Sequence, residues 1–279
     1  MDKYIFEQFI THIDDNDTSN FFKYLLLNSQ EKIDTKDKRY LQYYPQSKKG
    51  IKLIVETTKG SKDKLKVSGF KFHHLTKQEW EFKVVVPMKS FPNTYVVKRS
   101  NNTGSSCIRL VNEDILGKEL KPGTTIKGQV CGIVMLADIF KKEDDYRETV
   151  PVNEEGNKTV MNDGYLIPFN LITNNDAKLS EEERNKRNHS RDNLLTFKSK
   201  LKNVKEKEIS MFDLDLPNYY TATIDTTYGE LDIIIPKSIA NKYKGKLEDG
   251  NVIIGELLLS CDLCIDKYKD KVKDNKEEK

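Results

Sequence analysis

The sequence predicts an α+β protein, with a helical hairpin at its N-terminal end followed by two tandem, small, β-barrel-like modules. Three observations predict this class. Helical spacing of apolar residues is confined to about the first 30 residues, β-branched runs bounded by turn residues fill much of the remainder, and two sequence blocks recur in the same order. The chain of 279 residues is long enough for two domains, and its 37% hydrophobic content favours two small cores over one large core.

Residues 1–48 are predicted to form the helical hairpin and a polar lead-in. Apolar residues between positions 5 and 13 share one helical face. Asp17 or Thr18 can cap a second helix, whose apolar residues run from position 21 to 27. The rest of this region is polar and rich in tyrosine, and we interpret it as a linker.

Residues 49–171 are predicted to form the first β-rich module. Ile51–Val55 and Phe82–Val86 have the β-branched and aromatic composition of strands, and the proline that follows the second run cannot donate to a ladder. A long β run is expected from Thr125 to Phe140, followed by a charged excursion at 141–163. The module is therefore expected to be sheet, interrupted by loops.

The remaining chain is divided by composition. Residues 172–194 are dense in charge and asparagine, which predicts a linker between the modules. Residues 195–266 are predicted to form the second β-rich module, with a hairpin turn at 226–229. Residues 267–279 alternate lysines with acids and contain almost nothing apolar, which predicts a disordered tail.

Two blocks of sequence recur in the same order. Glu81–Pro87 matches Glu230–Pro236 in the character of each position, and Leu120–Gly128 matches Leu247–Gly255. Each second block ends in a glycine inside a predicted strand, where glycine often marks a bulge or a bend. Self-similarity in a fixed order indicates a repeated unit, so we expect the paired segments to occupy equivalent positions.

The predicted unit of strands, hairpin, short helix and strand resembles the OB-fold in architecture over residues 50–140 and 195–266. An SH3-like barrel or a looser sandwich fits the same pattern. The resemblance is to an architecture and not to a particular family. It implies a binding module, and duplicated modules on one chain raise the effective concentration for an extended ligand.

Basic residues lie among aromatic residues in both predicted modules, as they do in proteins that bind single strands. Lys198, Lys200 and Lys202 recur at period two, which places them on one face of a strand. The alternative interpretation is the solvated face of an amphipathic strand. The predicted nucleic-acid site comprises Lys71, His73, Trp80, Lys198, Lys200, Lys202, Tyr219 and Tyr220.

No catalytic or metal motif emerges. Cys261 and Cys264 have the spacing of half a zinc site, but no second ligand pair has the usual spacing. Nothing in the sequence fixes the distance between the histidines at 73 and 74 and the Ser-Ser-Cys loop that ends at Cys107. We expect no metal, no cofactor and no enzymatic activity, with an active site dispersed along the chain as the open alternative.

The predicted function is therefore non-enzymatic binding, with single-stranded DNA or RNA as the first partner. The alternative is a protein partner, with the chain acting as an inhibitor, an immunity protein or a factor in phage–host conflict. The 47 basic and 44 acidic residues nearly balance, so a nucleic-acid surface would have to arise from local asymmetry. The longest apolar runs are too short to span a bilayer, and the acidic start does not resemble a secretory signal, so we expect a cytoplasmic protein without membrane contact.

Overall fold

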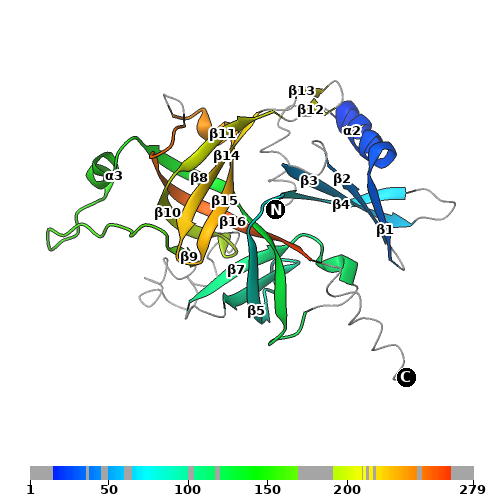
Figure 1. Ribbon diagram of the computed structural model, residues 1–279, viewed down its shortest axis with the longest axis horizontal. Coiled ribbons are helices and arrows are strands. Elements are labelled where there is room, and N and C mark those ends of the chain that lie inside the picture. The colour runs from blue at the N-terminus through cyan, green and yellow to red at the C-terminus, as the bar shows by residue number, and fades with distance from the viewer. Residues whose placement is uncertain are drawn as a thin grey trace.

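The architecture is that of a computed structural model, which describes residues 15–35, 38–44, 50–59, 65–99, 104–116, 120–168, 191–208, 210–211, 214–215, 218–243 and 247–264 (Figure 1). Across these residues the chain is mostly β, with 57% in strands. Its helices are short, namely α2 (Asp15–Asn28), α3 (Glu143–Thr149), α6 (Lys237–Ala240) and the 3-10 turn η2 (Glu113–Leu116). None of these described helices has the length and apolar character needed to cross a membrane.

A four-stranded antiparallel sheet follows α2 in the chain. Its strands pair in sequence order, namely β1 (Glu31–Asp34), β2 (Lys38–Tyr43), β3 (Ile51–Lys59) and β4 (Leu65–His74). Helix α2 lies beside this sheet, and Phe21 and Leu25 are 0% exposed in a cluster with Leu53 and Phe72 (Figure 1). The short helix is thus stabilised by tertiary packing, because a helix of this length is marginal alone.

The predicted N-terminal helical hairpin is wrong. One helix, α2, is followed directly by β1 and β2. The segment interpreted as a linker forms these strands because its tyrosines are core residues, with Tyr40 2% and Tyr43 6% exposed. The first predicted helix, at 3–13, lies outside the described residues.

A ten-stranded sheet contains most of the remaining chain. Its spatial order is β11-β14-β15-β8-β5-β6-β7-β16-β10-β9, with an additional pairing between β8 and β16. A separate two-stranded pairing joins β12 (Ser210–Met211) to β13 (Leu214–Asp215). The strands of the large sheet are β5 (Glu79–Pro87), β6 (Thr94–Arg99), β7 (Ser105–Leu110), β8 (Thr125–Phe140), β9 (Leu166–Pro168), β10 (Leu195–Lys200), β11 (Lys202–Lys207), β14 (Tyr219–Thr226), β15 (Gly229–Pro236) and β16 (Val252–Leu263).

Strands β8 and β16 form the centre of this sheet and have equivalent roles. They pair antiparallel from Val252 opposite Phe140 to Leu263 opposite Gly128, and they run side by side through the middle of Figure 1. The other edge of β8 pairs antiparallel with β5 and parallel with β15. The other edge of β16 pairs antiparallel with β10 and parallel with β7. Strands β8, β5, β6, β7 and β16 therefore form one closed circuit of pairing, and the branches β15-β14-β11 and β10-β9 extend from β8 and β16.

The prediction of two tandem barrel-like modules is wrong, because the halves of the chain are interleaved. Strand β16 pairs with β7 from the first half, and β8 pairs with β15 from the second half. The matched blocks that end in Gly128 and Gly255 do enter equivalent strands. The other matched pair does not, since β5 runs antiparallel to β8 whereas β15 runs parallel to it. An apolar run that ends in proline is compatible with any buried strand. The match between Glu81–Pro87 and Glu230–Pro236 therefore did not indicate equivalent positions in the sheet.

Gly128 and Gly255 lie where β8 and β16 approach most closely. A Cβ at Gly128 would clash with the backbone oxygen of Asp262, and one at Gly255 would clash with the backbone oxygen of Leu136. Neither obstacle is the end of a flexible side chain. Close backbone approach thus accounts for glycine in both copies of this block.

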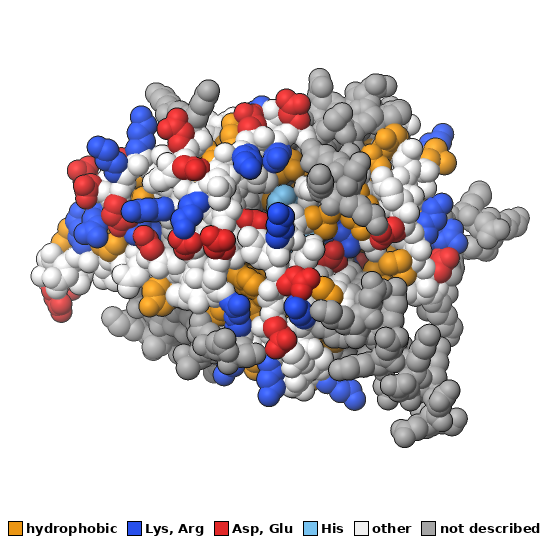
Figure 2. Space-filling view, viewed as in Figure 1, with side chains coloured by type: hydrophobic (Ala, Val, Ile, Leu, Met, Phe, Trp, Pro, Cys, Tyr) orange, Lys and Arg blue, Asp and Glu red, His pale blue; other side chains and the backbone are white. Residues whose placement is uncertain are grey.

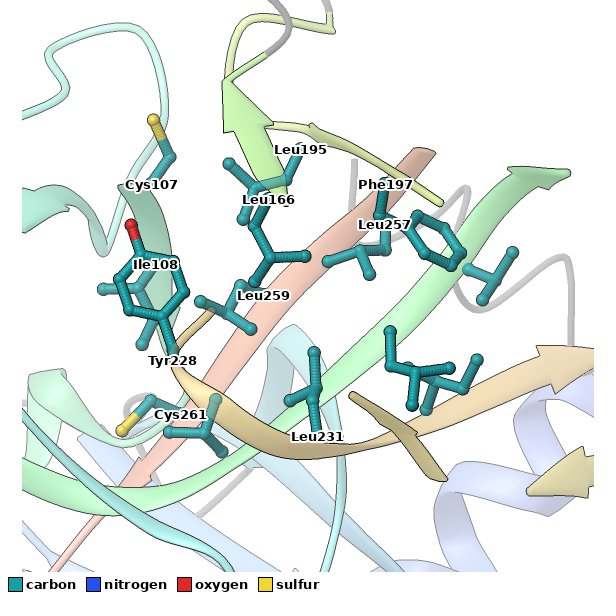
Figure 3. Close-up of a cluster of buried hydrophobic side chains, with 14 of the residues drawn as sticks. Cys107, Ile108, Leu166, Leu195, Phe197, Tyr228, Leu231, Leu257, Leu259 and Cys261 are labelled. Atoms are coloured by element: carbon teal, nitrogen blue, oxygen red, sulfur yellow. The ribbon is translucent and has the colours of Figure 1, made fainter. Parts of the chain in front are cut away.

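The main core lies within the large sheet and draws on both halves of the chain. Figure 3 shows Phe197, Leu257 and Leu259 converging with Leu231 and Ile108, although these residues come from four different strands. A second cluster joins α2 and the four-stranded sheet to residues of β8, β15 and β16. The two sheets therefore meet across a buried surface. Most of the predicted linker at 172–194, and the whole predicted tail at 267–279, lie outside the described residues.

Candidate functional site

The structure disperses the residues of the predicted nucleic-acid site. Trp80 is 3% exposed and Tyr219 is 1% exposed, so neither ring has a free face on which a base could stack. Trp80 packs beside Tyr228, with 5.9 Å between ring centroids, and Arg99 lies over its ring. Tyr220 is only partly buried and remains near the surface.

The three lysines at period two do not form a stripe. Lys198 is 2% exposed, and its Nζ lies 2.7 Å from both Glu143 Oε1 and Asp163 Oδ1. Lys200 is exposed and ends β10, whereas Lys202 begins β11 and pairs with Asp225 at 2.5 Å. The spacing predicted one solvated face, but α3 and the excursion after β8 supply the carboxylates that cover Lys198.

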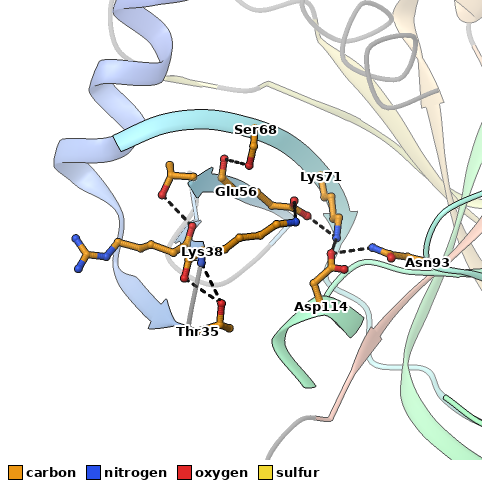
Figure 4. Close-up of polar contacts among 9 residues, drawn as sticks. Thr35, Lys38, Glu56, Ser68, Lys71, Asn93 and Asp114 are labelled. Carbon is orange, nitrogen blue, oxygen red and sulfur yellow. Dashed lines mark hydrogen bonds and ion pairs between the residues drawn. The ribbon is translucent and has the colours of Figure 1, made fainter. Parts of the chain in front are cut away.

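Lys71 belongs to a network that ties the two sheets together (Figure 4). Its Nζ lies 2.6 Å from Glu56 Oε1 on β3 and also contacts Asp114 of η2, which accepts a hydrogen bond of 2.9 Å from Asn93. Burial raises the pKa of Asp114, but Lys71 outweighs that effect and the net shift is downward. Lys71 is therefore occupied in holding η2 against the four-stranded sheet.

His73 lies in a second buried network, between the same sheets. Its Nδ1 is 3.0 Å from Ser260 Oγ and 3.6 Å from Cys131 Sγ. Burial lowers the pKa of His73 well below its usual value and raises that of Cys131 to about 12. All three side chains are 0% exposed. The histidine, serine and cysteine are therefore part of the packed interior, where no substrate can reach them.

Lys52 and Asp262 form the charged part of this interior. Lys52 Nζ lies 2.7 Å from Asp262 Oδ2, and Asn112 donates to Asp262 Oδ1 at 2.6 Å. Burial raises the pKa of Asp262, and the ammonium of Lys52 opposes that shift. We refer to Lys52, Lys71 and His73 with their partners as the interior network.

The cysteines give no indication of a metal site in the described part of the chain. Cys261 is fully buried, and burial raises the pKa of its thiol well above the usual range. Cys264 Sγ lies 3.7 Å from Glu79 Oε1. Within the described ranges, no group of three or more His, Cys, Asp or Glu side chains has the arrangement that could hold a metal ion.

A cavity of about 260 Å³ opens where the end of β4 meets β11, β14 and β15. We call it the basic cavity. Its lining is polar, with two lysines, a histidine, two threonines and one carboxylate. The lining residues are Gly50, His74, Asn203, Lys205, Lys207, Thr221, Ala222, Thr223 and Asp232.

A β-bulge sets the direction of the two lysines. The pairing of β11 with β14 shifts register between Lys202 and Lys205, and Asn203 adopts a φ of 53° there. Lys205 and Lys207 then share one face of β11, opposite Thr221 and Tyr219. Strand β11 is an edge of the large sheet, and neither lysine has an ion pair with another described residue.

His74 and Asp232 form the inner part of the basic cavity. Asp232 accepts hydrogen bonds of 2.8 Å from both Thr223 and Thr76. His74 is 9% exposed, and its Nδ1 has no hydrogen-bond partner among the described residues. Burial lowers the pKa of His74, whereas Asp232 and a hydrogen bond to the Gly50 backbone oppose the shift. Two ammonium groups without an ion pair among the described residues therefore lie beside a carboxylate that accepts from two threonines and an imidazole that favours its neutral form.

A second cavity, of about 470 Å³, lies between β2, the loop after β5 and η2. We call it the aromatic cavity, since Tyr40, Phe91 and Tyr95 line it together with Glu113 and Asp114. Tyr95 hydrogen-bonds Glu113, and burial raises the pKa of that carboxyl while this hydrogen bond opposes the shift. Because Asp114 is held by Lys71, the acids of this cavity are largely engaged.

Sequence reasoning missed Lys205, Lys207 and His74. The alternation Lys-Glu-Lys at 205–207 was a visible signal, but the bulge that aims the lysines at the cavity was not. Figure 2 shows acidic and basic side chains interleaved on the visible face, without a continuous basic groove. No protein-family model matches the chain, and a search of curated proteins finds no match. Similarity to known proteins therefore assigns it to no family.

Proposed function

We propose that the protein is a non-enzymatic binding protein that holds single-stranded nucleic acid at the basic cavity. The observation that carries this proposal is the pair Lys205 and Lys207, which line a polar cavity and have no ion pair with a carboxylate among the described residues. Lys52, Lys71 and Lys198 are, by contrast, buried and engaged with carboxylates. Unpaired ammonium groups at a cavity favour an anionic ligand, because phosphate contacts release counterions.

The position of β11 supports an extended ligand. Residues two apart on a strand lie about 6.6 Å apart, which is comparable with the spacing of successive phosphates in an extended single strand. Lys202 at the start of this edge is exposed and paired with Asp225. Tyr220 pairs with Glu206 on the neighbouring strand and so lies on the opposite face of the sheet from Lys205 and Lys207.

Charge reversal at the cavity tests the proposal. We expect Lys205→Glu with Lys207→Glu to abolish measurable binding of a fluorescent single-stranded oligonucleotide in anisotropy titrations. Each phosphate contact contributes about −0.7 to the slope of log K against log salt, so milder Lys→Gln changes at both positions should flatten the slope by about 1.4. Titrations at several salt concentrations measure this slope.

A matched control is available on the same sheet. Lys83 and Lys98 are exposed, face each other across β5 and β6, and lie outside the basic cavity. Reversing both changes the net charge equally and should leave most of the affinity intact. Equal losses in the two double variants would reduce the effect to net charge, and an unmutated protein that binds no oligonucleotide at low salt would overturn the proposal.

A protein partner is the second candidate, and one surface feature favours it. Val85 is 37% and Val86 45% exposed at the end of β5, next to the segment Pro87–Phe91 that lines the aromatic cavity. Exposed apolar residues beside a cavity are typical of protein contacts. Failure of the unmutated protein to bind nucleic acid would favour a protein partner.

A further inference from the structure

Beyond its two lysines, the basic cavity contains an acceptor group that a bare phosphate would not use. Asp232 is only partly buried and lines the cavity. A carboxylate offers about four lone-pair positions, and the described donors to it are Thr76, Thr223 and, at 3.5 Å, Gln78. The carboxylate therefore has capacity for one further donor from a ligand.

His74 lies beside Asp232 on the same side of the cavity. Its ring hydrogen-bonds to the Gly50 backbone, a contact that favours the protonated nitrogen and so identifies the ring as the donor. Its Nδ1 is buried and has no partner among the described residues, so it is not available to a ligand in the cavity. Asp232 is thus the acceptor on the inner side of the cavity, while Lys205 and Lys207 donate from β11.

A ligand that matches both sides carries hydroxyl donors next to anionic groups. A ribose unit within a strand has this combination, since its 2′-hydroxyl can donate while the adjoining phosphates are anionic. Deoxyribose lacks the hydroxyl, and it would leave the charge of Asp232 facing the ligand without a new donor. The 2′-hydroxyl is the group by which proteins distinguish RNA from DNA.

We propose that the basic cavity is a ribose site, in which the 2′-hydroxyl of one nucleotide donates to Asp232 while the flanking phosphates pair with Lys205 and Lys207. The inference rests on the proposed function and narrows it, so that the ligand is single-stranded RNA. Asp232 sets the specificity for the sugar, and the lysines supply affinity that is common to both nucleic acids.

Three oligonucleotides of one base sequence test this inference: RNA, its 2′-O-methyl derivative and DNA with deoxyuridine in place of thymidine. We expect the RNA to bind roughly tenfold more tightly than the other two, as one hydrogen bond to a charged group allows. The methylated strand keeps the ribose and removes only the donor. Equal, measurable affinities for all three would overturn the ribose site and leave nucleic-acid binding intact.

Variants separate the two parts of the cavity. Asp232→Asn should lower the ratio of RNA to DNA affinity toward one, whereas Lys205→Gln with Lys207→Gln should weaken both strands and keep that ratio. Melting curves establish that each variant is folded, because Asp232 bonds to Thr76 and Thr223. If Asp232→Asn does not fold, the affinities of the unmutated protein for the three oligonucleotides still test the ribose site. Binding of neither RNA nor DNA would overturn both the ribose site and the proposed function.

Discussion

The interior network and the basic cavity contain the same residue types in opposite states. Each has two lysines and a histidine, and both lie where the four-stranded sheet meets the ten-stranded sheet. In the interior, Lys52 and Lys71 are 5% exposed and held by carboxylates. In the basic cavity, Lys205 is exposed, and neither it nor Lys207 has an ion pair among the described residues. The partners of a lysine, and not its presence in a strand, decide whether it stabilises the fold or is free for a ligand.

The largest expected effect comes from breaking a buried pair of the interior network. Lys52→Met leaves the carboxylate of Asp262 buried without its cation, and we expect the free energy of unfolding to fall by about 3 kcal/mol. Lys207→Met should change it by less than about 0.5 kcal/mol, as for surface positions generally. Urea unfolding measures both values.

A second substitution sharpens this result. Asp262→Asn in the Lys52→Met background removes the unpaired charge and should recover part of the loss, because the amide can still accept from Asn112. A Lys52→Met protein as stable as the unmutated one would contradict the contrast between the two regions.

The neighbouring histidines should differ in how they link stability to pH. Burial lowers the pKa of His73 well below 6.5. Below pH 6.5 the unfolded chain therefore takes up a proton that the folded chain does not, and the free energy of unfolding rises with pH between the folded pKa and 6.5. The slope contributed by His73 can reach about 1.4 kcal/mol per pH unit.

His73→Asn keeps a hydrogen-bonding side chain near Ser260 and removes the titration, so it should flatten this dependence. His74→Asn should flatten it less, because Asp232 and the Gly50 backbone oppose the shift at His74. Urea unfolding at pH 5.5, 6.5 and 7.5 compares the three proteins. Identical slopes in all three would show that neither histidine is linked to folding.

A modest effect on stability, together with an effect on binding, is expected at the β-bulge. Asn203 has a positive φ, which asparagine tolerates better than alanine, so Asn203→Ala should cost about 1 kcal/mol. Because the bulge aims Lys205 and Lys207 at the cavity, the same change should weaken oligonucleotide binding. Asn203→Gly, which accepts this φ, should restore stability. Unchanged oligonucleotide binding by the alanine variant would show that the bulge does not position the lysines for binding.

The sequence indicated individual strands better than their arrangement. The run Thr125–Phe140 corresponds to β8, and Phe82–Val86 lies within β5. Both follow from local composition. The partners of these strands could not be derived in the same way, because parallel pairing of β7 with β16 and of β15 with β8 joins segments far apart in the chain. Buried strands with apolar runs carry little information about their neighbours.

The candidate site was less predictable for a similar reason. Lys198 and Lys205 both lie in strands with lysines two residues apart, and only the tertiary structure brings Glu143 and Asp163 to the first of them. The aromatic rings of Trp80 and Tyr219 could stack on bases, yet both side chains are buried in the hydrophobic cores. The cavity also requires the bulge at Asn203 and the end of β4, which no local pattern connects.

The pairing of β8 with β16 has a consequence for biosynthesis. The closed circuit of strand pairing cannot form before β16 exists, since β7 and β8 in the first half both pair with it, and β10 pairs with it as well. A ribosome-bound chain that has passed β8 therefore has strand edges without their final partners, which is a state open to aggregation. The pairing of β7 and β8 is thus complete only after Val252–Leu263 has been synthesised.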